Sequence, residues 1–147
     1  MNLLFANENK EQRERLIKLV NTITDEQLGL PLYEEGWTVA TALAHLAFWD
    51  ERRRVQLKNW TESGVKSSPI DGDTINDAMI PLLNLVPARE AANLAVSTAI
   101  AIDSELKDIS QDMIEKIRAS GDMHALDRSV HRKMHLDEID ALLANRM

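Results

Sequence analysis

The stretch HRKMHLDEIDALL (residues 131–143) decides the fold class, because its histidines and apolar residues recur at the spacing of an α-helix. At about 100° per residue, His131, His135 and Ile139 lie within roughly a quarter-turn of one another. The two histidines therefore occupy the N-terminal part of an apolar stripe that should contact other helices. This pattern predicts a long helix over about residues 125–145.

The same helical spacing continues through most of the chain, and nowhere do β-branched and aromatic residues alternate for long. Four long helices are expected, with shorter helical pieces in the connections. In chain order the expected helices cover about residues 8–21, a short turn opened by the capping box Thr24–Gln27, 39–61, 75–85, 87–109, 110–118 and 125–145. The sequence therefore predicts an all-α fold, a four-helix bundle formed by a single domain over residues 1–147.

The ends of these helices have local signals. Thr38 is expected to be the N-cap of the second long helix, and Pro87 suits the first helical position of the third. Pro81 is expected to kink or split the piece over 75–85. The segments LPLYEEGW (residues 30–37) and SGVKSSPIDGD (residues 63–73) are predicted loops.

Composition excludes several classes of function. The chain has no cysteine, so disulfides, cysteine metal ligands and a cysteine nucleophile are excluded, and any thiol would come from outside. The formal net charge of −7 argues against a nucleic-acid partner, and the basic cluster of Arg52–Arg54 with Lys58 is expected to be a solvated helix flank. No export signal opens the chain, and its least polar stretch, about residues 91–102, is too short to span a bilayer. We therefore expect no membrane partner and a cytoplasmic location.

A third histidine stands in the stretch GWTVATALAHLAFWD (residues 36–50). His45 lies at the edge of the apolar arc of its helix, which suits either a ligand beside a pocket or an ordinary half-buried histidine. His131 and His135 are four residues apart and share a helix face, while Arg132 is placed at the flank of that face. A bundle that brought the three imidazoles together would make a catalytic-type site for Zn, Ni or Fe, with an open coordination position. The alternative is that they are hydrogen-bonded core residues.

The two histidine stretches resemble the signatures of the DinB-like bundles. Residues 36–50 resemble the second-helix signature: a tryptophan, a small hydroxylic residue, then an apolar run to a histidine followed by Leu or Ile. Residues 131–143 resemble the fourth-helix signature, in which two histidines four apart precede an apolar residue. Together the stretches cover about a fifth of the chain, and the order and approximate spacing of the helices also match.

This resemblance implies an up-down-down-up bundle, often homodimeric, that binds one divalent metal through three histidines. Carried over by position, those ligands are His45, His131 and His135. The superfamily includes thiol-dependent S-transferases and isomerases that use a low-molecular-weight thiol such as mycothiol or bacillithiol, whose thiolate a metal would stabilise. Some catalytic relatives carry Glu where this chain has His131, so the site here resembles the all-histidine version.

Four other residues lie near these positions in the sequence, and the first three of them each have two interpretations. Trp49, one turn beyond the second-helix histidine, could wall a substrate pocket or pack in the core. Arg52 could meet a substrate carboxylate or remain solvated. Asp127 could orient the ring of His131 or serve as a first-turn acid favoured by the helix dipole. His124 has no counterpart in the family signatures and is expected in a loop or at the surface.

Three functions remain open from the sequence. The first is a metal-dependent protein that activates a thiol or water for transfer to, or hydrolysis of, a small electrophilic ligand. The second is a metal- or ligand-binding bundle without turnover, and the third is a structural or interaction bundle. A homodimer is expected, with the alanine-rich helix over residues 87–109 as a possible face.

Overall fold

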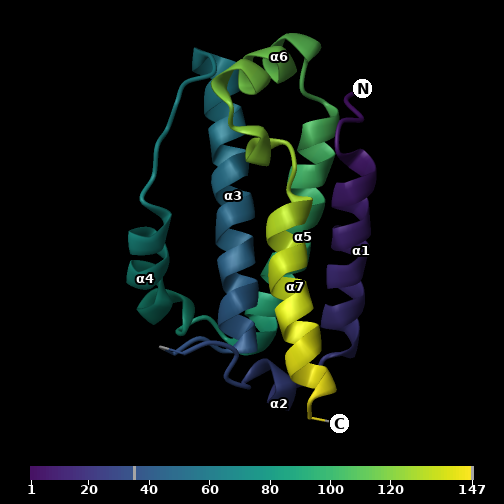
Figure 1. The fold of residues 1–147 in the computed structure, drawn as a ribbon, viewed down its shortest axis with the longest axis vertical. Coiled ribbons are helices and arrows are strands. Elements are labelled where there is room, and N and C mark those ends of the chain that lie inside the picture. Colours follow the sequence, from purple (N-terminus) through teal and green to yellow (C-terminus); the bar gives the residue numbers. More distant parts are fainter. Residues whose placement is uncertain (35, 147) are drawn as a thin grey trace.

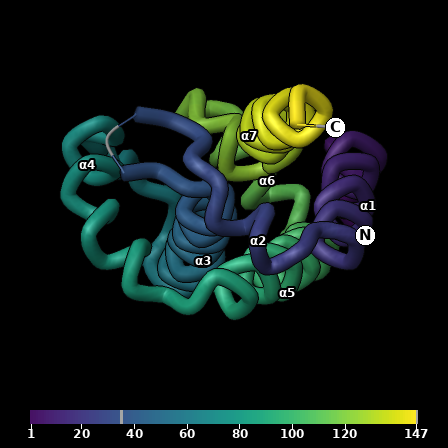
Figure 2. Tube along the Cα trace, turned by 90° about the horizontal axis from the view of Figure 1, so that it is seen from below, coloured from purple at the N-terminus to yellow at the C-terminus, as the bar shows by residue number. Residues whose placement is uncertain are grey.

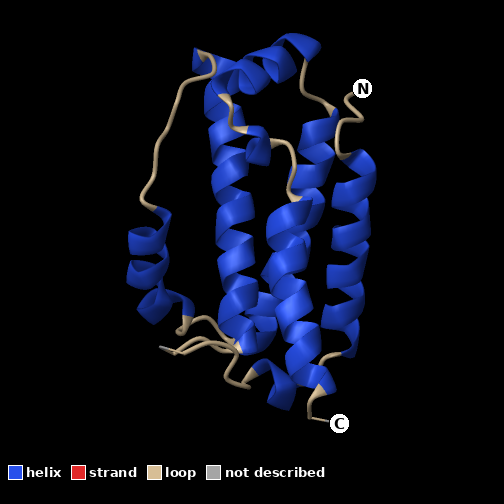
Figure 3. Ribbon diagram, in the orientation of Figure 1, coloured by secondary structure: helices blue, strands red, loops and turns tan. Residues whose placement is uncertain are grey.

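All regular secondary structure in the described part of the chain is helical (Figure 3). The computed structural model describes residues 1–34 and 36–146; Glu35, inside the predicted loop over residues 30–37, lies outside them. The long helices are α1 (Ala6–Thr22), α3 (Val39–Ser63), α5 (Ala88–Lys107) and α7 (Ser129–Ala144), which stand side by side (Figure 1). The connections contain α2 (Asp25–Leu28), α4 (Gly72–Leu83), α6 (Gln111–Ser120) and the 3-10 helix η1 (Met123–Ala125). The all-α prediction is confirmed.

Two predicted helix starts are confirmed by hydrogen bonds of the capping side chains. The Thr24 hydroxyl accepts from the backbone N–H of Gln27 at 3.1 Å, and the Gln27 side chain accepts in return from the N–H of Thr24 at 2.9 Å. The Thr38 hydroxyl accepts from the N–H of Thr41 at 3.1 Å. Each cap satisfies a donor that the first turn of a helix leaves without a partner.

Two details of the predicted helices are wrong. The last helix begins at Ser129 and not near residue 125, because Asp127 Oδ1 accepts from the N–H of Ser129 at 3.0 Å and fixes a turn there. Pro87 is the N-cap and not the first helical residue, since its ψ of 136° is extended. Of the two outcomes expected at Pro81, a kink or a split, the split does not occur, because α4 continues through this residue to Leu83.

The alanines of α5 allow this helix to lie close to its neighbours within the bundle. Ala91, Ala92, Ala95 and Ala99 are at most 1% exposed, and α5 packs against α3 and α1 (Figure 2). The small side chains leave room for the larger residues of the facing helices. Because this face is occupied inside the chain, a dimer would have to use another surface. Among the described residues, no helix combines the length and apolar character needed to cross a membrane.

A buried network of ion pairs joins the long helices where an apolar core would be expected. Arg132 is 1% exposed and donates to both oxygens of Asp103 at 2.9 Å and to Asp50 at 3.3 Å. Arg128 Nε donates to Asp50 at 2.9 Å, and Arg13 donates to Asp103 at 2.6 Å. Arg132, expected at the flank of the histidine face, is therefore fully buried, because carboxylates on α3 and α5 pair with its charge and allow its burial.

Candidate metal centre

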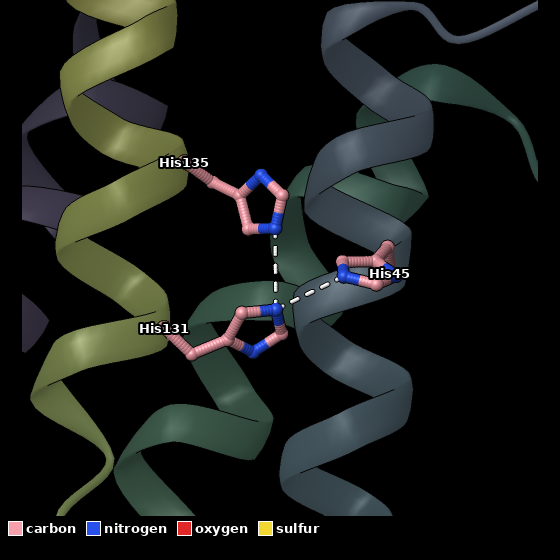
Figure 4. A group of neighbouring side chains, drawn as sticks. All are labelled: His45, His131 and His135. Carbon is pink, nitrogen blue, oxygen red and sulfur yellow. Dashed lines mark hydrogen bonds between the residues drawn. The ribbon is translucent and has the colours of Figure 1, made fainter. Parts of the chain in front are cut away.

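The three imidazoles singled out from the sequence meet between two helices. His45 comes from α3, while His131 and His135 come from successive turns of α7, and the rings point toward one another (Figure 4). The Nε2 atom of His131 lies 3.0 Å from Nε2 of His45 and 3.2 Å from Nε2 of His135. One nitrogen from each ring lies within 4.8 Å of those of the other two. The bundle thus brings together residues up to 90 positions apart in the chain.

The separations of 3.0 and 3.2 Å from Nε2 of His131 to its two neighbours suit a shared cation better than hydrogen bonds among the rings. Nitrogens bound to one ion at about 2.1 Å, in tetrahedral or octahedral geometry, stand roughly 3.0–3.4 Å apart. A neutral imidazole has one N–H and one lone pair, so Nε2 of His131 cannot satisfy both neighbouring nitrogens as a donor or as an acceptor. A divalent metal would take up all three lone pairs at once. The residues present therefore fit such an ion.

The surroundings of the site keep the three rings uncharged. Burial lowers the pKa of His45 to about 3, and the charge of His135 adds to the effect. Burial lowers the pKa of His131 to about 2, helped by the other two histidines and by the charges of Arg128 and Arg132. Burial also lowers the pKa of His135. At neutral pH the lone pairs are therefore free to bind a metal ion.

A loop residue that the sequence analysis did not assign holds one of the rings. The Tyr33 hydroxyl lies 2.8 Å from Nδ1 of His135, on the side of the ring away from the other histidines. Burial, followed by a hydrogen bond and the charge of Glu138, raises the pKa of Tyr33 well above its ordinary value, so the phenol keeps its proton. Trp37, from the same loop, packs edge-on against His45 with ring centroids 5.0 Å apart. This loop thus fixes the site from outside the two helices.

The comparison with protein families agrees with this geometry. The model of the DinB superfamily matches residues 8–142, which include all three histidines and the Tyr33 loop. The chain belongs to the DinB superfamily. No curated protein and no solved structure gives a significant match.

A cavity of about 320 Å³ opens beside the histidines of this DinB-superfamily chain. His45 and His131 form part of its wall, so two of the three rings are reached from it. Its apolar surface comes from Trp49, Ile70, Val130 and Met134. Its volume lies at the lower end of the range for small-molecule sites.

Of the four other residues considered in the sequence analysis, three line this cavity and one does not. Trp49 lines this cavity, and its indole N–H donates to Asn76 at 2.9 Å. Asp127 also lines it, but among the described residues its side chain accepts from the backbone N–H and the hydroxyl of Ser129 and does not bind His131. Arg52 is not part of this wall; it borders a different cavity, with its guanidinium 5.7 Å from the Trp49 ring centre. His124 is exposed in η1 at the cavity edge, which agrees with the expected surface position.

The prediction that the basic cluster Arg52–Arg54 is a solvated flank is wrong for Arg53. This residue pairs with Asp122 at 2.7 Å, and its side chain is 11% exposed. Arg54 pairs with Glu51 and Glu105, both at 2.8 Å, but its side chain remains 34% exposed. Asp122 is distant in the chain from Arg53, so the local sequence did not reveal this partner.

Proposed function

We propose that this protein binds one divalent metal ion through His45, His131 and His135 and acts on a small electrophile, as a thiol-dependent transferase or a metal-dependent hydrolase. The observation that carries the proposal is the meeting of three uncharged imidazoles, with nitrogens 3.0 and 3.2 Å apart, beside a cavity of about 320 Å³. When bound, Zn, Ni or Fe would favour the ionised form of a thiol such as bacillithiol or mycothiol, or of water.

Aromatic residues of the chain hold and shield the histidines on one side of the proposed site, and the cavity opens on the other. Tyr33 holds His135 through Nδ1 and so directs Nε2 of that ring toward the other two. Trp37 and Trp49 pack edge-on against His45, at centroid distances of 5.0 and 6.3 Å, and shield it from water. The cavity then leaves His45 and His131 open to a small molecule on the remaining side.

A second candidate is a metal- or ligand-binding protein without turnover. The observation in its favour is that Asp127, the carboxylate found among the described residues of the cavity wall, is bound by the N–H and hydroxyl of Ser129. This carboxylate holds the start of α7 and makes none of its hydrogen bonds to the three histidines, which would themselves be occupied by the metal.

Metal content decides whether the site exists. Chain purified without chelators and titrated with zinc should hold about one equivalent, and His135→Ala should lose it. His124→Ala removes an exposed histidine outside the triad and serves as the matched control. Equal zinc content in wild type and His135→Ala would refute the metal site.

Turnover separates the two candidate functions. Zinc-loaded protein should accelerate the reaction of a low-molecular-weight thiol with an alkyl halide, or the hydrolysis of an activated ester, and His135→Ala should not. One equivalent of metal without any such acceleration would favour the binding protein.

We also propose the up-down-down-up helix order and a homodimer. Figure 1 supports the order, because α1 and α7 start at one end of the bundle while α3 and α5 start at the other. Size-exclusion chromatography with light scattering tests the dimer.

A further inference from the structure

Arg128 is a buried cation with one nitrogen left over at the cavity. The residue is 4% exposed and lines the cavity together with His131. Its Nε donates to Asp50 at 2.9 Å, and its Nη1 donates to the carbonyl oxygen of His124 at 2.8 Å. Its Nη2 makes no hydrogen bond to the described residues, and this nitrogen keeps some surface accessible to solvent. At least part of the accessible surface of Arg128 therefore belongs to a nitrogen that can donate to a ligand.

The positive charge of Arg128 is only partly neutralised by its neighbours. Asp50, its carboxylate partner, also accepts from Arg132. Within the buried network three arginines, Arg13 among them, face two carboxylates, those of Asp50 and Asp103. One positive charge of this network is therefore in excess, and Arg128 is the member that lines the cavity, where burial makes an anionic partner more favourable than it would be in water.

The other arginine of the cavity wall is already paired. Both terminal nitrogens of Arg53 donate to the two oxygens of Asp122, at 2.7 and 3.0 Å, and one also donates to Gln56. Asp127 adds a negative charge to the same wall, which disfavours an anion of charge two or more. Arg128 is thus the group on this wall best placed to bind a singly charged anion.

We propose that the cavity binds a small carboxylate, with its charged end on Nη2 of Arg128 and its apolar body against Trp49, Val130 and Met134. Nη2 offers two N–H groups to the carboxylate oxygens, and charge-assisted hydrogen bonds of this kind are the strong ones. This inference rests on the proposed function for the role of the carboxylate, which is to bring the small molecule to the histidine site.

A pair of ligands of equal shape tests the charge preference in the unmodified chain. Benzoate and benzamide differ in charge at one end, and both can be titrated into chelator-treated protein by calorimetry. Without metal, a preference for benzoate cannot come from metal coordination. Benzoate should bind at least about tenfold more tightly than benzamide. Equal affinity for the two ligands would overturn the inference, and this comparison needs no variant to fold.

Two arginine substitutions locate the preference. Arg128→Gln should remove it, whereas Arg52→Gln, on the arginine outside this cavity, should keep it. A preference that survives Arg128→Gln, or that is lost in Arg52→Gln alone, would also overturn the inference.

Zinc content of the same protein separates this result from the proposed function. One equivalent of zinc with no preference for benzoate would refute the carboxylate site alone. A preference for benzoate in a protein that holds no zinc would refute the metal proposal alone.

Discussion

Replacing Tyr33 by Phe tests whether a loop phenol orients a metal-binding imidazole. The substitution removes one oxygen, which lies 2.8 Å from Nδ1 of His135. If Nε2 of His135 binds a metal, Nδ1 must have the proton, so the Tyr33 oxygen accepts it and the phenol O–H turns to Glu138. Without the oxygen, the Nδ1–H has lost its partner in a ring that is 5% exposed.

The expected effect is a loss of zinc affinity with little loss of stability. Removing a partner that orients a histidine ligand lowers metal affinity about 10- to 100-fold, or about 1.4–2.7 kcal/mol. In the metal-free protein His135 can move its proton to the other nitrogen, so the unfolding free energy should change by less than about 1 kcal/mol. Competition with a chromophoric chelator measures the affinity, and urea unfolding measures the stability.

Glu138→Gln is the control for this experiment, because the amide oxygen can still accept the phenol O–H. It should weaken zinc binding less than Tyr33→Phe does. If Tyr33→Phe binds zinc as tightly as the wild type, then Tyr33 does not orient the ligand and the reasoning fails.

The remaining predictions concern the forces that hold the site in place. Arg132→Met should lower the unfolding free energy in urea by about 3–5 kcal/mol, because it removes a guanidinium from between Asp50 and Asp103; a loss below 1 kcal/mol would contradict this. Lowering the pH from 7.5 to 5.5 should destabilise the metal-free protein. Histidines in the unfolded chain take up protons near pH 6.5, whereas the three buried rings have lowered pKa values in the folded protein. The contribution of these rings to the unfolding free energy is therefore complete above pH 6.5 and is lost as the pH falls toward the folded pKa values. Unfolding curves at several pH values check this, and a flat profile would disprove it. Thr38→Ala should lower the unfolding free energy, measured by thermal unfolding, by about 1 kcal/mol, because the N–H of Thr41 loses its acceptor. Thr38→Ser keeps a hydroxyl at the N-cap and should be nearly neutral.

Most of the helical fold could be predicted because its signals are local. The capping box of Thr24 with Gln27 and the cap of Thr38 depend on residues three apart, and both occur in the structure. The start of α7 was missed because its helical spacing also fits the residues before it. The turn made by Asp127 on Ser129 competes with that spacing and ends it.

The histidines could be predicted as a group because two of them share one helix face and a family signature includes all three. Tyr33 could not, since it lies in a loop without periodicity and is 102 residues from His135. The burial of Arg132 was hidden for a similar reason. A helical pattern places an arginine outward, and only the distant carboxylates of Asp50 and Asp103 make burial favourable.

The start of α7 shows how the charged network and the histidine site depend on each other. Arg128, His131, Arg132 and His135 are spaced three and four residues apart, so they form one continuous face of polar residues where an apolar stripe would be usual. The two arginines bind Asp50, which lies on α3, the helix that also contributes His45. Apolar packing would tolerate some sliding of α7 along α3, but these hydrogen bonds are directional and allow one register. Buried ion pairs add little net stability over apolar contacts, so fixing the distance between the histidines of the two helices is the better physical reason for burying these arginines here.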